Sequence, residues 1–149
     1  MAGQDTHLRI LRLADGDLGP LSGYVRVPKS LAFSVDGSML ATSGLDLGVV
    51  WTLRDGAARN AEPGLFSHDG SATKDVAFHD SEPRLLMTTH AGGVYVVDAS
   101  MRSSEQHVAL VDSLPSVCIW SGDDVLVGTA RGELLRFSID LAASAATAA

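Results

Sequence analysis

The sequence predicts an all-β fold built from repeated four-stranded units, and three observations carry this prediction. Fifteen glycines among 149 residues, with many Val, Leu, Ser and Thr residues, favour short strands joined by tight turns. A pattern of two apolar strands around a polar turn recurs, which places Phe33, Phe78 and Ile119 at equivalent positions 45 and 41 residues apart. Each copy is followed by a turn and further strand residues. Four strands per unit with a period of about 40–45 residues are typical of β-propeller blades.

The first half of each unit is predicted to be a hairpin. Its three copies are Ser30–Gly44, Asp75–His90 and Ser116–Ala130. In each copy a short apolar strand leads into a polar turn and then into a second apolar strand. The turns at Val35–Gly37 and Ser121–Asp124 contain Gly and Asp, which tolerate the positive φ of tight hairpins. These stretches therefore supply the inner strands of three units.

The second half of each unit is predicted to be an outer strand pair that follows a turn. The copies are Gly44–Leu53, Ala91–Asp98 and Arg131–Ser138, with a further copy at Gly3–Gly16. Leu11, Trp51, Val97 and Phe137 then occupy equivalent places, 40, 46 and 40 residues apart. The run from Val94 to Val97 alternates in a way that suits a strand covered on both faces. The chain is thus expected to hold three complete units and the outer strands of a fourth.

These units resemble WD40 repeats over residues 3–140. Gly3-Gln4-Asp5 and Gly44-Leu45-Asp46 match the Gly-Asp turn of the family. The Trp-Asp position of the family reads Leu11-Arg12, Trp51-Thr52, Val97-Asp98 and Phe137-Ser138, so no copy carries the full pair. The upstream Gly-His signal of the family survives as Ser67-His68. The resemblance implies a partial WD40-type β-propeller of about three and a half degenerate repeats, in which Trp51 belongs to the core.

The repeats divide the chain into five expected segments. Residues 1–16 form the outer strand pair of a preceding blade, and residues 17–56, 57–100 and 101–140 each form a WD40-like blade. Residues 141–149 are a low-complexity tail that is either frayed or weakly helical. The turns at Ala14–Gly16 and Arg54–Gly56 are expected to mark the exits from one blade to the next.

The number of blades bears on partners, because a closed propeller needs about four to eight of them. An open stack of three and a half blades leaves a sheet edge and an apolar face uncovered. Three explanations remain open: the chain is part of a larger protein, two copies associate to build one ring, or another chain completes the propeller. The first is favoured.

Composition and charge narrow the function classes. The sequence is 46% hydrophobic and 19% charged, which disfavours disorder over most of the chain. Its formal net charge is −7, and its Lys and Arg residues are scattered, so nucleic acid is not an expected partner. The first residues lack the pattern of a signal peptide, and the apolar runs are shorter than a bilayer span. No membrane association is expected, and the expected location is cytoplasmic, with cytoskeletal or nuclear association as alternatives.

The sequence has no recognisable catalytic or metal-binding motif. Its five histidines are dispersed, and none are spaced as metal ligands on one element. Asp123-Asp124 falls in a predicted hairpin turn, where adjacent aspartates are usually solvated. The single cysteine, Cys118, lies in an apolar run and is expected to be a small buried hydrophobe. No enzymatic activity, metal or cofactor is expected.

The expected function is a protein-interaction scaffold whose partners are proteins or peptides. Its rigid blades would present turn side chains on the two edges of the propeller. The candidate partner-binding residues are Arg54, Asp55, Arg84, Trp120 and Arg131. Trp120 has two readings that the sequence leaves open: it anchors a partner, or it packs under the neighbouring turn.

Two alternative functions are retained. The last 80 residues or so resemble the late blades of centrosomal WD40 adaptors that target γ-tubulin complexes to spindles. A ligand-binding or enzymatic propeller would require polar side chains that converge on a central channel. The innermost strands, expected at residues 30–34, 75–79 and 116–120, are mainly small or apolar, which disfavours a catalytic channel.

Overall fold

The computed structural model of the chain describes residues 6–24, 26–58, 61–66, 69–101 and 105–139. The described residues form β-strands joined by turns, with one short 3-10 helix at Arg54–Gly56. No helix among them is long and apolar enough to cross a membrane. His68 and the predicted tail at 141–149 lie outside the described residues.

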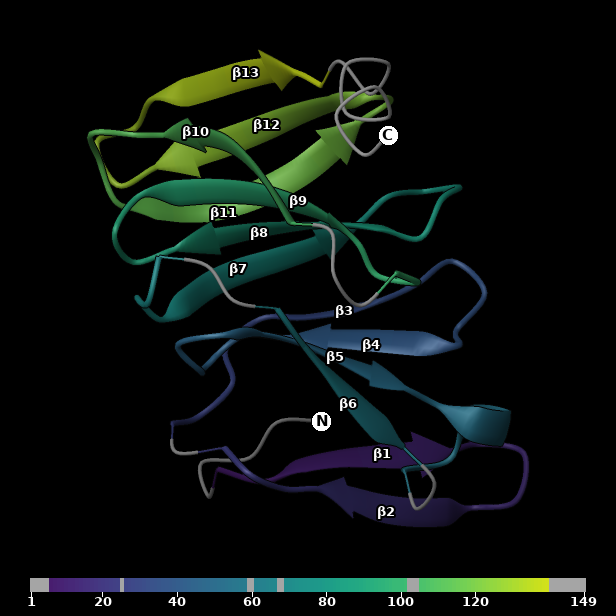
Figure 1. Cartoon of the computed structure of the whole chain (residues 1–149). Coiled ribbons are helices and arrows are strands. Elements are labelled where there is room, and N and C mark those ends of the chain that lie inside the picture. The colour runs from purple at the N-terminus through teal and green to yellow at the C-terminus, as the bar shows by residue number, and fades with distance from the viewer. Residues whose placement is uncertain (1–5, 25, 59–60, 67–68, 102–104, 140–149) are drawn as a thin grey trace.

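The strands form four antiparallel sheets in the order of the sequence (Figure 1). The first is a hairpin of β1 (Leu8–Arg12) and β2 (Asp17–Leu21). The second consists of β3 (Leu31–Phe33), β4 (Met39–Thr42), β5 (Gly48–Thr52) and β6 (Glu62–Phe66). The third consists of β7 (Thr73–Phe78), β8 (Arg84–Thr89), β9 (Gly93–Asp98) and β10 (Glu105–Leu110). The last consists of β11 (Pro115–Ser121), β12 (Asp124–Thr129) and β13 (Leu134–Ser138).

This arrangement confirms the predicted all-β partial propeller. The innermost strands β3, β7 and β11 lie next to one another, and each sheet continues outward from them (Figure 1). The β1–β2 hairpin stands before the first four-stranded sheet as the outer part of a further blade. The last sheet has three strands among the described residues.

The outer strand pairs lie later in the sequence than predicted. The stretch Gly44–Leu53 contains one strand, β5, and its pairing partner β6 follows only at Glu62. The first hairpin likewise extends to Leu21, so the expected segment 1–16 separates β1 from its partner β2. The expected boundaries after residues 16, 56 and 100 each fall between two paired strands of one sheet: β1 and β2, β5 and β6, and β9 and β10. These boundaries therefore do not separate the blades. The physical reason is that the turns at Ala14–Gly16 and Arg54–Gly56 join antiparallel neighbours within one sheet rather than successive blades.

The predicted hairpin turns of the inner strands are confirmed. Gly37 (φ 71°) lies between β3 and β4, and Gly122 (φ 60°) lies between β11 and β12. Both positions have the left-handed backbone that glycine adopts at little cost.

The core is divided into layers between successive sheets. The first layer contains Leu8, Ile10, Leu40, Val49 and Trp51. The second contains Val50, Phe66, Val76, Met87 and Val97, and the third contains Leu86, Val94, Val96, Val125 and Val127. Neighbouring residues of β8 and β9 therefore belong to different layers, because side chains alternate across a strand. The prediction that both faces of the Val94–Val97 strand are covered is confirmed.

Two residues singled out in the sequence belong to this core. The indole of Trp51 is buried, and its Nε1–H donates a hydrogen bond of 2.6 Å to the Tyr24 hydroxyl. Cys118 is also buried and packs in the third layer. Both predictions, a core Trp51 and a buried hydrophobic Cys118, are confirmed.

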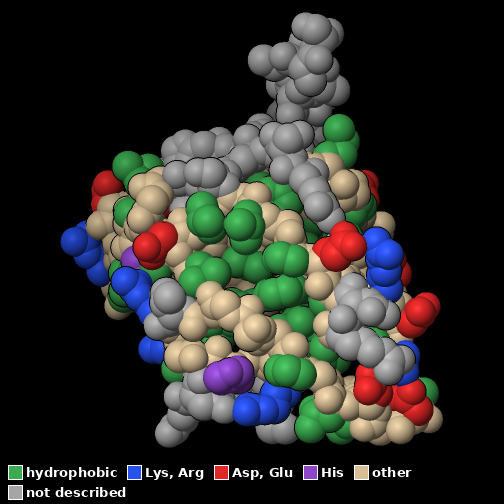
Figure 2. All heavy atoms as spheres, turned by 60° about the horizontal axis from the view of Figure 1, so that its bottom comes forward, with side chains coloured by type: hydrophobic (Ala, Val, Ile, Leu, Met, Phe, Trp, Pro, Cys, Tyr) green, Lys and Arg blue, Asp and Glu red, His purple; other side chains and the backbone are tan. Residues whose placement is uncertain are grey.

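The outward faces of the innermost strands β3 and β11 keep exposed apolar side chains. On β3, Ala32 packs toward the second core layer, whereas its neighbours Leu31 and Phe33 are exposed on the opposite side. On β11, Val117 and Ile119 are each 50% exposed, whereas Cys118 between them is buried. Figure 2 brings the β1–β2 end of the molecule forward and shows hydrophobic side chains gathered across that face. The fold thus leaves apolar surface uncovered where a propeller would continue.

Candidate functional site

The turns of the fold lie on two opposite edges of the sheets. One edge carries the turns after β3, β7 and β11 and the turns after β5 and β9; we call it the Asp36 edge. The opposite edge carries the turns after β4, β8 and β12 and the connections between successive sheets; we call it the Lys74 edge. Successive strands are antiparallel, so the chain reaches the opposite edge at the end of each strand, and consecutive turns alternate between the two edges.

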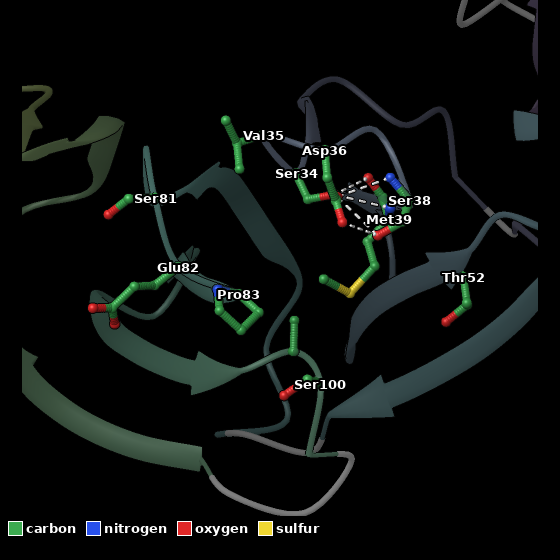
Figure 3. A pocket seen from close by; sticks show the side chains of 11 residues that line it. Ser34, Val35, Asp36, Ser38, Met39, Thr52, Ser81, Glu82, Pro83 and Ser100 are labelled. Carbon is green, nitrogen blue, oxygen red and sulfur yellow. Dashed lines mark hydrogen bonds between the residues drawn. The ribbon is translucent and has the colours of Figure 1, made fainter.

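A cleft of about 530 Å³ opens on the Asp36 edge between the first two four-stranded sheets (Figure 3). Its walls come from the turn at 34–39, from Thr52, from the turn at 81–83 and from residues 99–100. Its lining combines hydroxyl, acidic and apolar side chains: Ser34, Val35, Asp36, Ser38, Met39, Thr52, Ser81, Glu82, Pro83, Ala99 and Ser100. This volume lies within the range of ligand pockets, which is about 300–1,000 Å³.

Asp36 is the best-defined polar group of the cleft. One of its carboxylate oxygens accepts hydrogen bonds from the Ser34 hydroxyl at 2.7 Å and from the Ser38 backbone N–H at 3.0 Å. The Ser38 hydroxyl also donates to both carboxylate oxygens, at 2.8 and 2.9 Å. These donors, led by the Ser34 hydroxyl, lower the pKa of Asp36 to about 2. The cleft therefore holds a fixed negative charge at neutral pH.

Backbone hydrogen bonds brace the walls of this cleft. Ser34 N–H donates to the carbonyl of Met39 at 2.9 Å, which closes the turn that carries Asp36. Leu53 N–H donates to the carbonyl of Ser38 at 2.8 Å, and Ala99 N–H donates to the carbonyl of Pro83 at 2.7 Å. In both sheets the inner turn is thus tied to the outer turn beside it, so the cleft is formed before any ligand arrives.

Two of the five predicted site residues, Arg84 and Trp120, meet between the second and third blades. The Arg84 guanidinium carbon lies 5.7 Å from the centre of the Trp120 ring. Arg84 Nε donates to Glu82, and Arg84 Nη2 donates to Asp123 at 3.3 Å. Arg84 is buried as the first residue of β8, so its expected exposure in a turn is wrong.

Trp120 follows the packing alternative that the sequence left open. Its Nε1–H donates to the carbonyl of Ala77 at 3.0 Å, and its ring meets the His79 imidazole edge-on at a centroid distance of 4.9 Å. The His79 ring also lies 3.1 Å, Nε2 to O, from the carbonyl of Gly122. The indole therefore joins the third blade to the second.

The remaining three predicted residues are dispersed. Arg54 pairs with Glu62 at 2.9 Å, and both side chains are exposed. Asp55 has a positive φ of 57°, and its carbonyl accepts a 2.9 Å hydrogen bond from Arg12 Nη1. Arg131 lies on the Lys74 edge, in the turn between β12 and β13. The structure thus joins Arg84 with Trp120, places Arg54 and Asp55 in one turn of the same edge, and separates Arg131 from all four.

Asp36 and the cleft around it were not predicted from the sequence. The available signal was the spacing Ser34-Val35-Asp36-Gly37-Ser38, in which both hydroxyls can reach the carboxylate within one turn. The second wall, from Ser81 to Pro83, could not be predicted, because it depends on how two sheets pack. Within the described ranges, no group of three or more His, Cys, Asp or Glu side chains could hold a metal ion.

A fan of antiparallel sheets that meet at their innermost strands defines a partial β-propeller, and comparison with solved structures identifies its type as WD40. The chain is similar to the structure of U3-55K, with a TM-score of 0.74 and 15% sequence identity over 92% of this chain and 47% of that chain. It is similar to the RRP9 WD40 repeats, with a TM-score of 0.73 and 16% identity over 92% of this chain and 46% of that chain. The chain therefore spans about half the length of these structures. No family model and no curated protein sequence matches it.

Proposed function

We propose that this chain is a protein-interaction module that binds an extended protein segment in the cleft of the Asp36 edge. The observation that carries the proposal is the combination of a fixed carboxylate with exposed apolar side chains in one preformed cleft. Asp36 supplies the charge, and exposed apolar surface comes from Val35 in the same turn and from Pro83 on the opposite wall (Figure 3). A segment with a basic side chain next to an apolar one complements this lining.

The mechanism is rigid presentation. The turn that carries Asp36 is closed by its own backbone hydrogen bonds, and the opposite wall is anchored to the sheet by the bond from Ala99 to Pro83. Because the turns are already ordered, a bound segment loses its own conformational freedom but does not have to order the cleft as well. Hydroxyls of Ser81 and Ser100 offer hydrogen bonds to the backbone of the segment.

The other functions considered for this chain have less support. The spindle-adaptor and enzymatic alternatives have no specific observation in their favour. The WD40-type fold is common to proteins with different ligands, so it is the cleft rather than the fold that supports binding.

Selection from a displayed library of short peptides, followed by fluorescence anisotropy with the selected peptides, tests this proposal. The selected peptides should carry Lys or Arg beside an apolar residue. Asp36→Asn keeps a side chain suited to the turn and removes the charge, so it should weaken binding on the order of tenfold. The matched control is Asp112→Asn, an exposed aspartate on the Lys74 edge, which should leave binding unchanged. Equal affinity of both variants, or a library that yields no binder, contradicts the proposal.

A further inference from the structure

A second cleft, of about 360 Å³, lies on the Lys74 edge between the same two four-stranded sheets. One wall is formed by the connection from β2 to β3 and the turn after β4, and the other by the start of β7 and the turn after β8. Its lining residues are Arg26, Val27, Lys29, Ser43, Gly44, Ala72, Thr73, Lys74 and His90. Three of these side chains are cationic and none is a carboxylate, in a chain whose formal net charge is −7.

The cations act on one common region. The pKa of His90 is lowered, first by desolvation and then by the positive charges of Lys74, Arg26 and Lys29. All three charges therefore reach the same imidazole, although they come from two different sheets. Since its ordinary pKa is already 6.5, His90 is neutral at pH 7 and offers a ring N–H rather than a further charge.

Few carboxylate side chains of the protein itself neutralise these three cations. Arg26 lies 3.9 Å from Asp46, and both side chains are more than 60% exposed, so this pair is weak and screened. The ammonium groups of Lys29 and Lys74 make no ion pair or hydrogen bond with the residues that the structure describes. A local positive potential thus remains in the cleft and attracts anions.

Hydrogen bonds within each wall and between the two walls fix the shape of the cleft. Ser43 Oγ accepts the backbone N–H groups of Lys29 at 3.0 Å and of Ser30 at 2.9 Å. Across the cleft, Thr73 N–H donates to the carbonyl of Leu45 at 2.8 Å. Within the second wall, His90 N–H donates to the carbonyl of Ala72 at 2.9 Å. The backbones that carry the cations are therefore fixed relative to one another.

We propose that this cleft binds an acidic peptide segment of a protein partner, with carboxylate side chains placed between Arg26, Lys29 and Lys74. The three cations and the hydroxyls of the lining match a short segment with a few negative charges. An extended nucleic acid would carry its negative charges beyond the cleft onto a net acidic protein, which opposes its binding. This site lies on the edge opposite the Asp36 cleft and selects the opposite charge, so the proposal does not rest on the function proposed above.

Fluorescence anisotropy with a labelled short peptide rich in Glu tests the proposal, with the same peptide carrying Gln as the ligand control. The Glu peptide should bind and the Gln peptide should not, and added salt should weaken binding. Lys29→Glu combined with Lys74→Glu should weaken binding at least on the order of tenfold, while Lys74→Arg should retain it. Arg131→Glu is the matched protein control, because Arg131 is an exposed cation on the same edge outside the cleft. Circular dichroism melting curves establish that each variant is folded.

Three results would overturn the inference. The first is equal binding of the Glu and Gln peptides. The second is an equal loss of affinity in the Lys29→Glu/Lys74→Glu and Arg131→Glu variants, because diffuse attraction would then explain binding. The third is tighter binding of a single-stranded oligothymidine than of the Glu peptide, with loss of that binding in the Lys29→Glu/Lys74→Glu variant. In addition, Asp36→Asn should leave Glu-peptide binding unchanged, which separates this test from that of the Asp36 cleft.

Discussion

Asp75 Oδ2 accepts the backbone N–H of Cys118 at 2.7 Å, and this bond links the innermost strands of two blades. The other carboxylate oxygen accepts the hydroxyl of Ser30, which precedes the innermost strand of the first four-stranded sheet. The Ser30 oxygen in turn accepts the backbone N–H of Val76 at 3.1 Å. One aspartate therefore joins the inner strands of three successive sheets, where no β-ladder connects them.

Replacing this aspartate should destabilise the fold. Asp75→Ala removes the acceptor of two hydrogen bonds and should lower the free energy of unfolding by about 2 kcal/mol, as expected for hydrogen bonds to a charged group. Urea denaturation followed by circular dichroism measures the change. Asp112→Ala is the control, because this aspartate is exposed, and it should change the free energy by less than about 0.5 kcal/mol. Equal effects of the two substitutions would show that Asp75 does not hold the blades together.

The sequence predicted the strands whose residues alternate or form apolar runs, and it missed those that lack such a signal. The inner hairpins and the strands β5, β9 and β13 were located by their Val- and Leu-rich runs. The outer strands β2 and β6 contain Pro20 and Pro63, which argue against a strand in the sequence. These prolines are tolerated because β2 and β6 are edge strands. The backbone on the outer side of an edge strand has no partner strand, so a missing N–H there breaks no hydrogen bond of the sheet.

The candidate site was less predictable than the fold. Arg84 and Trp120 were singled out by residue type, but their contact depends on how the third and last sheets pack. The two clefts likewise combine residues from separate sheets, so no local pattern indicates them. Hydrogen-bonding partners such as Ser34 and Ser38 around Asp36 were within reach of sequence reasoning, because they lie in one turn.

The buried hydroxyl of Tyr24 offers a second stability prediction. It accepts the Nε1–H of Trp51 at 2.6 Å and also shares a hydrogen bond with the Thr42 hydroxyl. Tyr24→Phe leaves the indole donor buried without an acceptor and should lower the free energy of unfolding by about 1–3 kcal/mol. Urea denaturation provides the measurement. In a double-mutant cycle with Trp51→Phe, the combined loss should be smaller than the sum of the single losses, and additive losses would contradict the coupling.

The lowered pKa of Asp36 predicts that the stability of the fold decreases at low pH. Its pKa is about 2 in the folded protein and 3.8 ordinarily, so its ionised form stabilises the fold at every pH above 3.8. This contribution should decline as the pH falls below 3.8 and be lost as it passes through about 2. Nuclear magnetic resonance titration of the carboxyl carbon should give a midpoint near 2. Ser38→Ala should raise that midpoint, and an unchanged midpoint would exclude the serine hydroxyl as its cause.

Arg84 and Arg131 make a matched pair for separating a structural arginine from a solvated one. Arg84→Ala removes the packing of the side chain over Trp120 and its bonds to Glu82 and Asp123, and should cost about 1–3 kcal/mol of folding free energy. Arg131→Ala affects an exposed turn and should cost less than about 0.5 kcal/mol. Thermal and urea denaturation of both variants measure the difference. Comparable stability of the two variants would contradict a structural role for Arg84.

The Cys118 thiol should be inert in the folded protein. Its side chain is buried, and its pKa is raised well above 9.0, first by desolvation and then by the negative charge of Asp75. Both effects suppress the thiolate, which is the reactive form. A thiol reagent such as dithionitrobenzoate should therefore react slowly at neutral pH and rapidly once urea has unfolded the chain.

Asp75→Ala connects this reactivity to the contact between the blades. The substitution removes the bond to the Cys118 backbone and the charge that opposes thiolate formation. Labelling of the folded variant should consequently be faster than labelling of the wild type, whereas Asp112→Ala should leave the rate unchanged. Rapid labelling of the wild-type protein under native conditions would contradict the burial of Cys118. Equal rates in the wild type and the Asp75→Ala variant would instead mean that burial alone protects the thiol.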